Sequence, residues 1–172
     1  MHAAAFAAAA LAAAAMPAAF DAAAPPATKP CSSPEYRQFD FWVGNWRVTD
    51  PQGKFAGTND VTLEYGGCVV QEHWHGAEGG VGSSFNAYRP STKMWHQTWV
   101  DSQGQVILLD GTYANGVMNL SGPFKTRKGV AGINRIRWTH IDADHVRQLW
   151  DYTLDGGKTW AVAFDGLYTR VK

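Results

Sequence analysis

One acidic side chain of the sequence, Glu72 in the stretch GGCVVQEHW, is suited to acid–base chemistry. Alternation along residues 68–75 puts Glu72 on the same strand face as Val70 and Trp74. An inward carboxyl group between aromatic side chains is expected to have a raised pKa, unless Arg170 or another cation pairs with it. Such a group can donate or accept a proton near neutral pH. The alternative interpretation is an ion pair or a hydrogen-bond network that organises the interior.

Polar and aromatic side chains alternate in the same way on other segments. Residues 94–101 place Gln97 and Trp99 on one face, and residues 145–152 do the same with Gln148 and Trp150. A concave aromatic surface with a few converging polar groups is the usual form of a small-molecule site. We therefore expect the ligand-binding residues to be Glu72, Trp74, Asn86, Tyr88, Gln97, Trp99, Gln148 and Trp150.

Recurrent turn sequences indicate which elements position these side chains. Examples are DPQG at 50–53, ANG at 114–116 and DGGK at 155–158. Asn-Gly and Asp-Gly favour hairpin turns because these residues adopt positive φ readily. The segments between the turns are rich in Val, Ile, Thr, Trp and Tyr, which is typical of strands. The spacing predicts about ten antiparallel strands in chain order.

A sheet of that length hides its edges most easily by closing into a barrel. Ser33, Pro34 and Glu35 predict one short helix over residues 34–42, ahead of the first strand. The fold class that we predict is therefore all-β, a single antiparallel up-and-down barrel. In this prediction the helix plugs one end of the barrel with Phe39, Phe41 and Trp42.

The predicted faces also define the rest of the interior. Aromatic walls are expected from Trp46, Trp95, Trp160, Phe164 and Tyr168 in addition to the residues above, and further polar groups from Asp101 and Arg170. Buried polar groups need hydrogen-bond partners, which can be each other, water or a ligand. Two interpretations stay open, a hollow barrel with a ligand and a filled barrel with an internal polar network.

The sequence resembles the calycins, the superfamily of lipocalins and fatty-acid-binding proteins. Gly44-Asn45-Trp46 matches the Gly-x-Trp signature that opens their first strand, and Arg170 matches the arginine that crosses over that tryptophan. FDFWVGNW, GGCVVQEHW, SSFNAY, WHQTWVD, RIRWT and GGKTWAVAFDGLYTR look like an uncharacterised family of exported bacterial calycin-like proteins, over nearly all of residues 34–172. The resemblance implies structural roles for Gly44, Trp46 and Arg170, and it implies no particular activity.

Metal and haem chemistry have weaker support. His73 and His75 have a spacing that can bind zinc with a third ligand, but alternation points both of them outward, together with His96. Nitrobindins are calycins that bind haem through one histidine, and His140 and His145 lie near predicted strand ends. Neither is placed clearly inside the barrel. We predict no metal and no cofactor, with haem as the alternative.

The first thirty residues differ from the rest. Residues 1–24 are mostly alanine and are interpreted as a signal peptide, although the start lacks Lys and Arg; a low-complexity tail is the alternative. Their apolar run is too short and too weakly hydrophobic for a spanning helix. A Pro/Ala-rich linker is expected over 25–33 and the barrel domain over 34–172. The protein is thus predicted to be periplasmic or secreted, without membrane insertion of the mature chain.

The cysteine count and the charge narrow the function further. An exported chain with only Cys31 and Cys68 favours a disulfide between them, and two buried thiols are the alternative. Lys plus Arg and Asp plus Glu both number 15, so there is no basic field to attract nucleic acid.

Together these features predict an exported calycin-like barrel that binds a small, partly polar organic molecule. Aromatic compounds are among the candidate ligands. One alternative is a lipocalin-like enzyme that performs proton transfer, isomerisation or cyclisation with Glu72 as the catalytic acid or base. A second alternative is a structural envelope protein with a filled barrel. The sequence names neither the ligand nor the oligomeric state.

Overall fold

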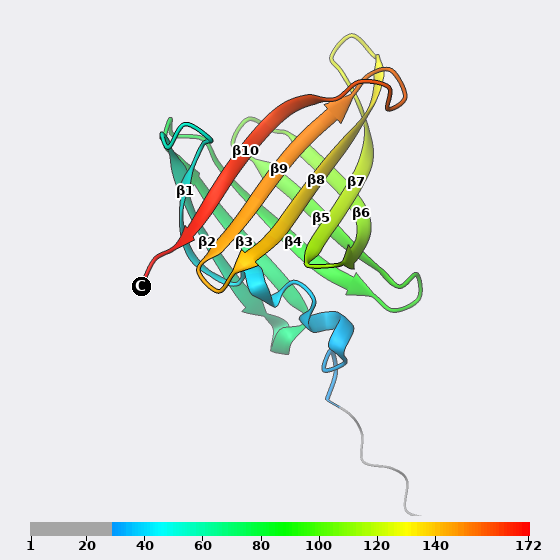
Figure 1. Cartoon of the computed structure of the whole chain (residues 1–172). Helices are drawn as coiled ribbons and strands as arrows, with labels where there is room; N and C mark the ends of the chain where they lie inside the picture. Colours follow the sequence, from blue (N-terminus) through cyan, green and yellow to red (C-terminus); the bar gives the residue numbers. More distant parts are fainter. Residues whose placement is uncertain (1–28) are drawn as a thin grey trace, which may run out of the picture.

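The computed structural model describes residues 29–172, which form a closed β-barrel (Figure 1). Ten antiparallel strands follow one another in chain order, and the barrel closes where β1 (Gly44–Thr49) pairs with β10 (Ala161–Arg170). The remaining strands are β2 (Phe55–Glu64), β3 (Val69–Gly76), β4 (Val81–Arg89), β5 (Met94–Asp101), β6 (Val106–Ala114), β7 (Val117–Lys125), β8 (Ala131–Asp142) and β9 (His145–Thr153). The prediction of an all-β up-and-down barrel of about ten strands is confirmed.

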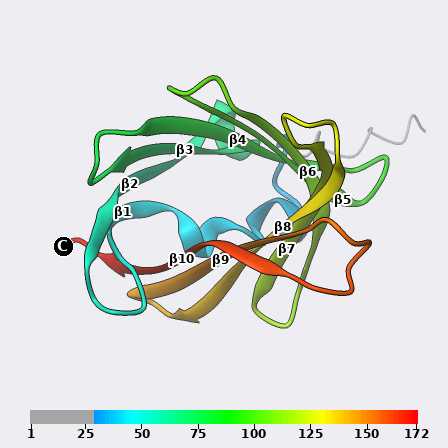
Figure 2. The ribbon, with the colours of Figure 1, turned by 90° about the horizontal axis from the view of Figure 1, so that it is seen from above.

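The segment ahead of β1 differs in detail from the predicted helix. Residues 34–42 contain two short 3-10 helices, η1 (Pro34–Arg37) and η2 (Asp40–Trp42), separated by Gln38 and by Phe39, which has φ −109° and ψ 6°. The Ser33 hydroxyl donates to the Glu35 carboxylate and does not cap the backbone of η1. A third such turn, η3 (Tyr65–Gly67), connects β2 to β3. Viewed from above, the segment before β1 lies within the outline of the barrel (Figure 2).

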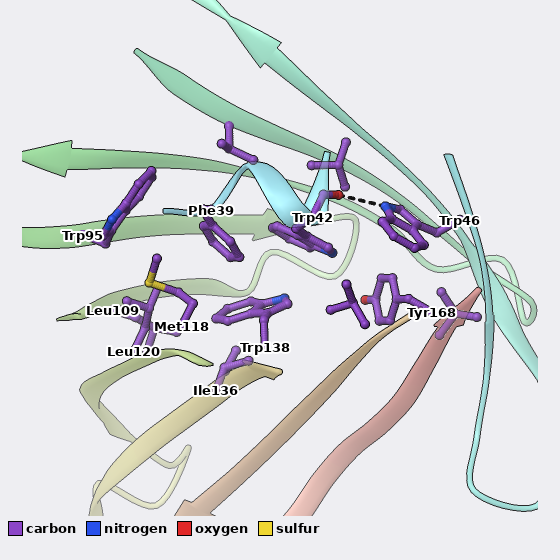
Figure 3. Packing of buried hydrophobic residues seen from close by; sticks show 14 of the residues in the cluster. Phe39, Trp42, Trp46, Trp95, Leu109, Met118, Leu120, Ile136, Trp138 and Tyr168 are labelled. Atoms are coloured by element: carbon purple, nitrogen blue, oxygen red, sulfur yellow. Dashed lines mark hydrogen bonds between the residues drawn. The ribbon is translucent and has the colours of Figure 1, made fainter. Parts of the chain in front are cut away.

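Aromatic side chains of this segment form the centre of the core (Figure 3). Phe39 and Trp42 are fully buried and stack with 4.9 Å between ring centroids. Trp138 of β8 lies 5.3 Å from each of these two rings, and Trp95 of β5 lies 5.6 Å from Phe39. Each such pair adds about 0.5–1.5 kcal/mol beyond the burial of its area. The part of the barrel around Phe39 and Trp42 is therefore filled.

The predicted disulfide between Cys31 and Cys68 is confirmed. It joins the chain ahead of η1 to the residue that follows η3. Arg37 of η1 donates a hydrogen bond to the carbonyl oxygen of Gly67 beside it. The N-terminal segment is thus held to the β2–β3 connection by one covalent bond and one hydrogen bond.

Arg170 and Trp46 meet where the first and last strands pair. The Arg170 guanidinium lies 4.2 Å from the centre of the Trp46 ring and donates a 2.9 Å hydrogen bond to the Val43 carbonyl. Trp46 Nε1 in turn donates to the Trp42 carbonyl at 2.8 Å. Gly44 has φ +142°, and a Cβ at this position would lie 2.1 Å from Arg170 Nη1. Only glycine therefore leaves room for the guanidinium in this arrangement.

The predicted inward face of the last strand is wrong at its start. A register shift between Val162 and Phe164 breaks the alternation, because a bulge turns the side chains before it to the other face. Val162 is 63% exposed. Trp160 covers the guanidinium of Arg135 at 3.8 Å, and Arg135 pairs with Asp151. Trp160 is thus part of an ion-pair cluster and does not line the interior.

The predicted signal peptide over 1–24 lies outside the described residues, and so do residues 25–28 of the predicted linker. Within residues 29–172, no helix has the length and apolar character needed to span a membrane.

Candidate functional site

A cavity of about 180 Å³ lies inside the barrel, next to the filled part. Along β5, Trp95 packs on the N-terminal segment, whereas Trp99 lines the cavity four residues later. Along β8, Trp138 likewise packs on the N-terminal segment, and Ile136 lines the cavity. Ala163 in the lining is exposed, so the cavity reaches solvent on that side. It is lined by Glu72, Trp74, Gln97, Trp99, Ile107, Ile136, Gln148, Trp150, Ala163, Phe164 and Tyr168.

Glu72 is the charged group of this lining, and it is held by neutral donors. Asn59 Nδ2 donates to Glu72 Oε1 at 2.8 Å, and Ser84 Oγ donates to Glu72 Oε2 at 2.7 Å. Only 4% of the Glu72 surface is exposed, and no salt bridge to this carboxylate exists within residues 29–172. Burial raises its pKa to about 7 against the opposing effect of the two hydrogen bonds. The carboxyl group can therefore exchange a proton near neutral pH.

A polar network continues from Ser84 through the wall of the barrel. Asn86 Nδ2 donates to Ser84 Oγ at 2.9 Å and to the Val70 carbonyl at 3.0 Å. Gln97 Nε2 donates to Asn86 Oδ1 at 2.9 Å and lies 3.4 Å from Ser84 Oγ. Asn86 is fully buried behind this network and does not line the cavity. Asn86, expected at the ligand surface, thus lies in the wall behind the cavity.

Tyr88 also lies away from the cavity. Its ring packs 5.3 Å from Tyr36 of η1 and 6.1 Å from Trp95. Ser84, Asn86 and Tyr88 alternate along β4 and share one face of this strand. Since the barrel is filled around the N-terminal segment, the last residue of this series meets that segment instead of the cavity.

Tyr168 and Gln148 form a second polar pair in the lining. The Tyr168 hydroxyl donates to Gln148 Oε1. Burial raises the pKa of Tyr168 well above its usual value, and the nearby Glu72 charge adds to this effect. Tyr168 therefore stays neutral at physiological pH and acts as a hydrogen-bond donor.

The aromatic walls lie against glycines of the sheet. A Cβ at Gly82 would lie 2.3 Å from the Trp99 ring, and one at Gly57 would lie 2.7 Å from the Trp74 ring. Each ring thus occupies the space that a side chain on the adjacent strand would need. The glycines keep these two rings close to the wall, and the centre of the cavity stays open.

Other polar residues considered from the sequence lie outside the cavity. Asp101, predicted inside, accepts hydrogen bonds from the backbone nitrogens of Gln103 and Gln105 in the β5–β6 turn. His73 contacts Ser83 and His96 pairs with Asp110.

The two histidines considered for haem are also elsewhere. His140 stacks on Phe41 at 5.0 Å, and His145 is hydrogen-bonded to Asp142. Neither residue belongs to the cavity lining. Residues 29–172 contain no group of three or more His, Cys, Asp or Glu side chains placed to hold a metal ion.

Four residues of the site were not predicted from the sequence. Ile107, Ile136 and Ala163 line the cavity, and Asn59 holds Glu72. Alternation along residues 57–61 could have placed Asn59 inward, because Val61 and Gly57 flank it two positions away. The bulge in β10 conceals Ala163, because it puts this residue out of phase with the rest of the strand.

The six residues Glu72, Trp74, Gln97, Trp99, Gln148 and Trp150, all expected at a ligand site, are brought together around one cavity. The arrangement can bind a small molecule, and its carboxyl group can exchange a proton with one. No protein-family model matches the chain, and a search of curated proteins also found no match.

Proposed function

We propose that this protein is an exported, calycin-like barrel that binds a small, partly polar organic molecule in its interior. The observation that carries the proposal is the cavity, in which aromatic rings surround a buried carboxyl group and two side-chain amides. A cavity of about 150 Å³ accommodates benzene. The 180 Å³ found here favours a ligand of about one ring with a short substituent.

Export and the position of the N-terminal segment belong to the same proposal. The Cys31–Cys68 disulfide supports export, because disulfides persist in oxidising compartments. The burial of Phe39 and Trp42 supports a segment that closes one end of the barrel. In this arrangement the ligand enters from the side on which Ala163 is exposed. The Arg170–Trp46 contact supports the calycin resemblance.

The test is a tryptophan-fluorescence screen of the full chain against small metabolites, because Trp74, Trp99 and Trp150 line the cavity. Ile107→Phe puts added volume into the cavity. Leu108→Phe places a similar ring on the outer face of the same strand, where Leu108 is 54% exposed. The proposal is supported if Ile107→Phe weakens binding of a ligand and Leu108→Phe leaves it unchanged.

Two results would contradict ligand binding in the cavity. One is the absence of any response across the library, together with no small molecule found by mass spectrometry in the purified protein. The other is a ligand whose affinity Leu108→Phe reduces and Ile107→Phe leaves unchanged, because that ligand would bind outside the barrel.

A second candidate function is catalysis by proton transfer, as in an isomerase or a cyclase. The specific observation is Glu72, whose pKa of about 7 suits a catalytic acid or base, in the cavity lining beside the neutral hydroxyl of Tyr168. A bound compound should then be converted to product, and Glu72→Gln should abolish conversion while the protein stays folded. Unchanged conversion by this variant would exclude the role.

A further inference from the structure

The charge of the cavity restricts its ligand. Among the lining residues none is Lys, Arg or His, and Glu72 is the only carboxylate. The other ionisable group of the lining, Tyr168, stays neutral because burial raises its pKa. A carboxylate or phosphate ligand would find no cation in the lining and would lie near a second negative charge, which costs free energy in a buried site.

The walls of the cavity favour positive charge. The faces of aromatic rings carry partial negative charge, and cations bind over them, most strongly over tryptophan. Three tryptophans and one phenylalanine line this cavity. The Trp74 and Phe164 rings meet edge to face at 5.8 Å. Since Trp74 also lies two residues from Glu72 on the same face of β3, ring and carboxylate are neighbours.

The hydrogen bonds within the wall decide which atoms remain for a ligand. Gln97 uses its Nε2 for Asn86 and Ser84, so its acceptor Oε1 is left. Each Glu72 oxygen accepts one hydrogen bond from the protein and can accept another. Gln148 accepts from Tyr168 through Oε1, which leaves its Nε2 as a donor. Among the carboxyl and amide groups of the lining, the free atoms are thus mainly acceptors at Glu72 and Gln97, with one amide donor on Gln148.

Resting on the proposed ligand-binding function, we propose that the cavity takes a small organic cation. Its ligand is a protonated amine on a frame of about one ring, with the ammonium group paired to Glu72 and the frame between the aromatic walls. The ammonium supplies N–H donors for the Glu72 and Gln97 oxygens. A hydroxyl or carbonyl oxygen elsewhere on the frame would accept from Gln148.

The experiment measures the binding of three probes of matched size to the full chain at about pH 8. The probes are 2-phenylethylamine (a cation), 2-phenylethanol (neutral) and phenylacetate (an anion). We expect the amine to bind at least about tenfold more tightly than the alcohol, and the anion to bind least. Glu72→Gln should remove the preference for the amine. Glu78→Gln, the same change at a side chain that is 91% exposed, should retain it.

A pH series with the unchanged protein keeps the test decisive if Glu72→Gln does not fold. At about pH 5.5 the Glu72 carboxyl group is protonated, so affinity for the amine should fall about tenfold or more, and affinity for the alcohol should stay constant.

The outcomes separate this inference from the proposed function. Equal or tighter binding of the alcohol or of phenylacetate, without dependence on Glu72, overturns the cation assignment and leaves ligand binding in place. No binding of any probe, together with no response to the metabolite library, overturns both.

Discussion

Ser84 and Glu72 are joined directly across β4 and β3, because the Ser84 hydroxyl donates a 2.7 Å hydrogen bond to Glu72 Oε2. This bond lowers the pKa of the Glu72 carboxyl group, whereas burial raises it. Asn86 and Gln97, which also donate to Ser84, each have a second acceptor. Glu72 Oε1 has Asn59 as its donor, whereas Oε2 has no donor other than Ser84 within residues 29–172.

Ser84→Ala should destabilise the protein by about 1–3 kcal/mol at about pH 8, because it leaves a buried carboxylate oxygen without a donor. The pKa of Glu72 should rise further. Denaturant unfolding at several pH values measures both effects. Ser83→Ala is the control on the neighbouring residue, whose hydroxyl contacts His73 instead. Equal losses for the two variants would contradict the role assigned to Ser84.

Glu72 should make the free energy of unfolding decrease as the pH rises from 4.5 to about 7. In that interval the folded chain holds the proton of Glu72 and the unfolded chain releases it, so a higher pH favours unfolding. The whole effect is on the order of 3 kcal/mol, is absent below this interval and is constant above it. Subtracting the profile of Glu72→Gln from that of the unchanged protein isolates it from other groups.

Glu72→Gln is expected to fold because the Asn59 side chain can adapt to it. Asn59 Oδ1 has no hydrogen-bond partner within residues 29–172. A half-turn of the Asn59 amide would let this oxygen accept from the new side-chain amide. A difference profile that is flat across the interval would contradict the raised pKa of Glu72.

Gly82→Ala should shift the Trp99 ring, because the added Cβ would lie 2.3 Å from it. The Val100 carbonyl oxygen, 2.9 Å from the added Cβ, belongs to the backbone of the sheet, so the ring is the group that moves. We expect a loss of about 1–3 kcal/mol in stability and a shift in tryptophan emission. Gly80→Ala is the control, since no atom lies within 4 Å of its added Cβ. Unchanged emission in Gly82→Ala would show that Trp99 does not rest on Gly82.

Removal of the disulfide in Cys31→Ser/Cys68→Ser should cost about 4 kcal/mol, from the loop-closure entropy of two residues 37 positions apart. The unchanged protein under reducing conditions should lose the same amount in denaturant unfolding. A loss of less than about 1 kcal/mol in both cases would contradict the stabilisation expected from loop closure.

Gly44→Ala should destabilise the protein much more in the presence of Arg170 than in its absence. The new Cβ collides with the guanidinium, and the φ of +142° adds backbone strain that does not depend on Arg170. A double-mutant cycle with Arg170→Ala separates the two parts, with an expected coupling on the order of 1–2 kcal/mol. A coupling near zero would assign the whole requirement for Gly44 to its backbone conformation.

Alternation predicted the cavity residues best where strands are regular. Trp74 and Glu72 on β3, and Gln97 and Trp99 on β5, face inward as the period of two requires, since neither strand contains a register shift. The same rule failed at Trp160, because a bulge in β10 reverses the faces of the residues ahead of it. Bulges depend on the pairing of two strands and leave little trace in the sequence of one.

The sequence predicted a plug made by Phe39, Phe41 and Trp42, but it did not predict which inward-facing residues reach the cavity. Asn86 and Gln97 both face inward, yet only Gln97 reaches the cavity. The difference arises because Asn86 lies behind Ser84 and Gln97, to which it is hydrogen-bonded.

The pairing of the first and last strands also bears on how fast the protein folds. Arg170 donates to the carbonyl of Val43 across 127 positions of the chain. To form a contact between such distant residues, the chain must first lose the entropy of closing a long loop, and the contact becomes favourable only afterwards. Local hairpins such as β7–β8 bear no such cost. We expect folding on the order of milliseconds to seconds, with a rate set by the meeting of the two chain ends.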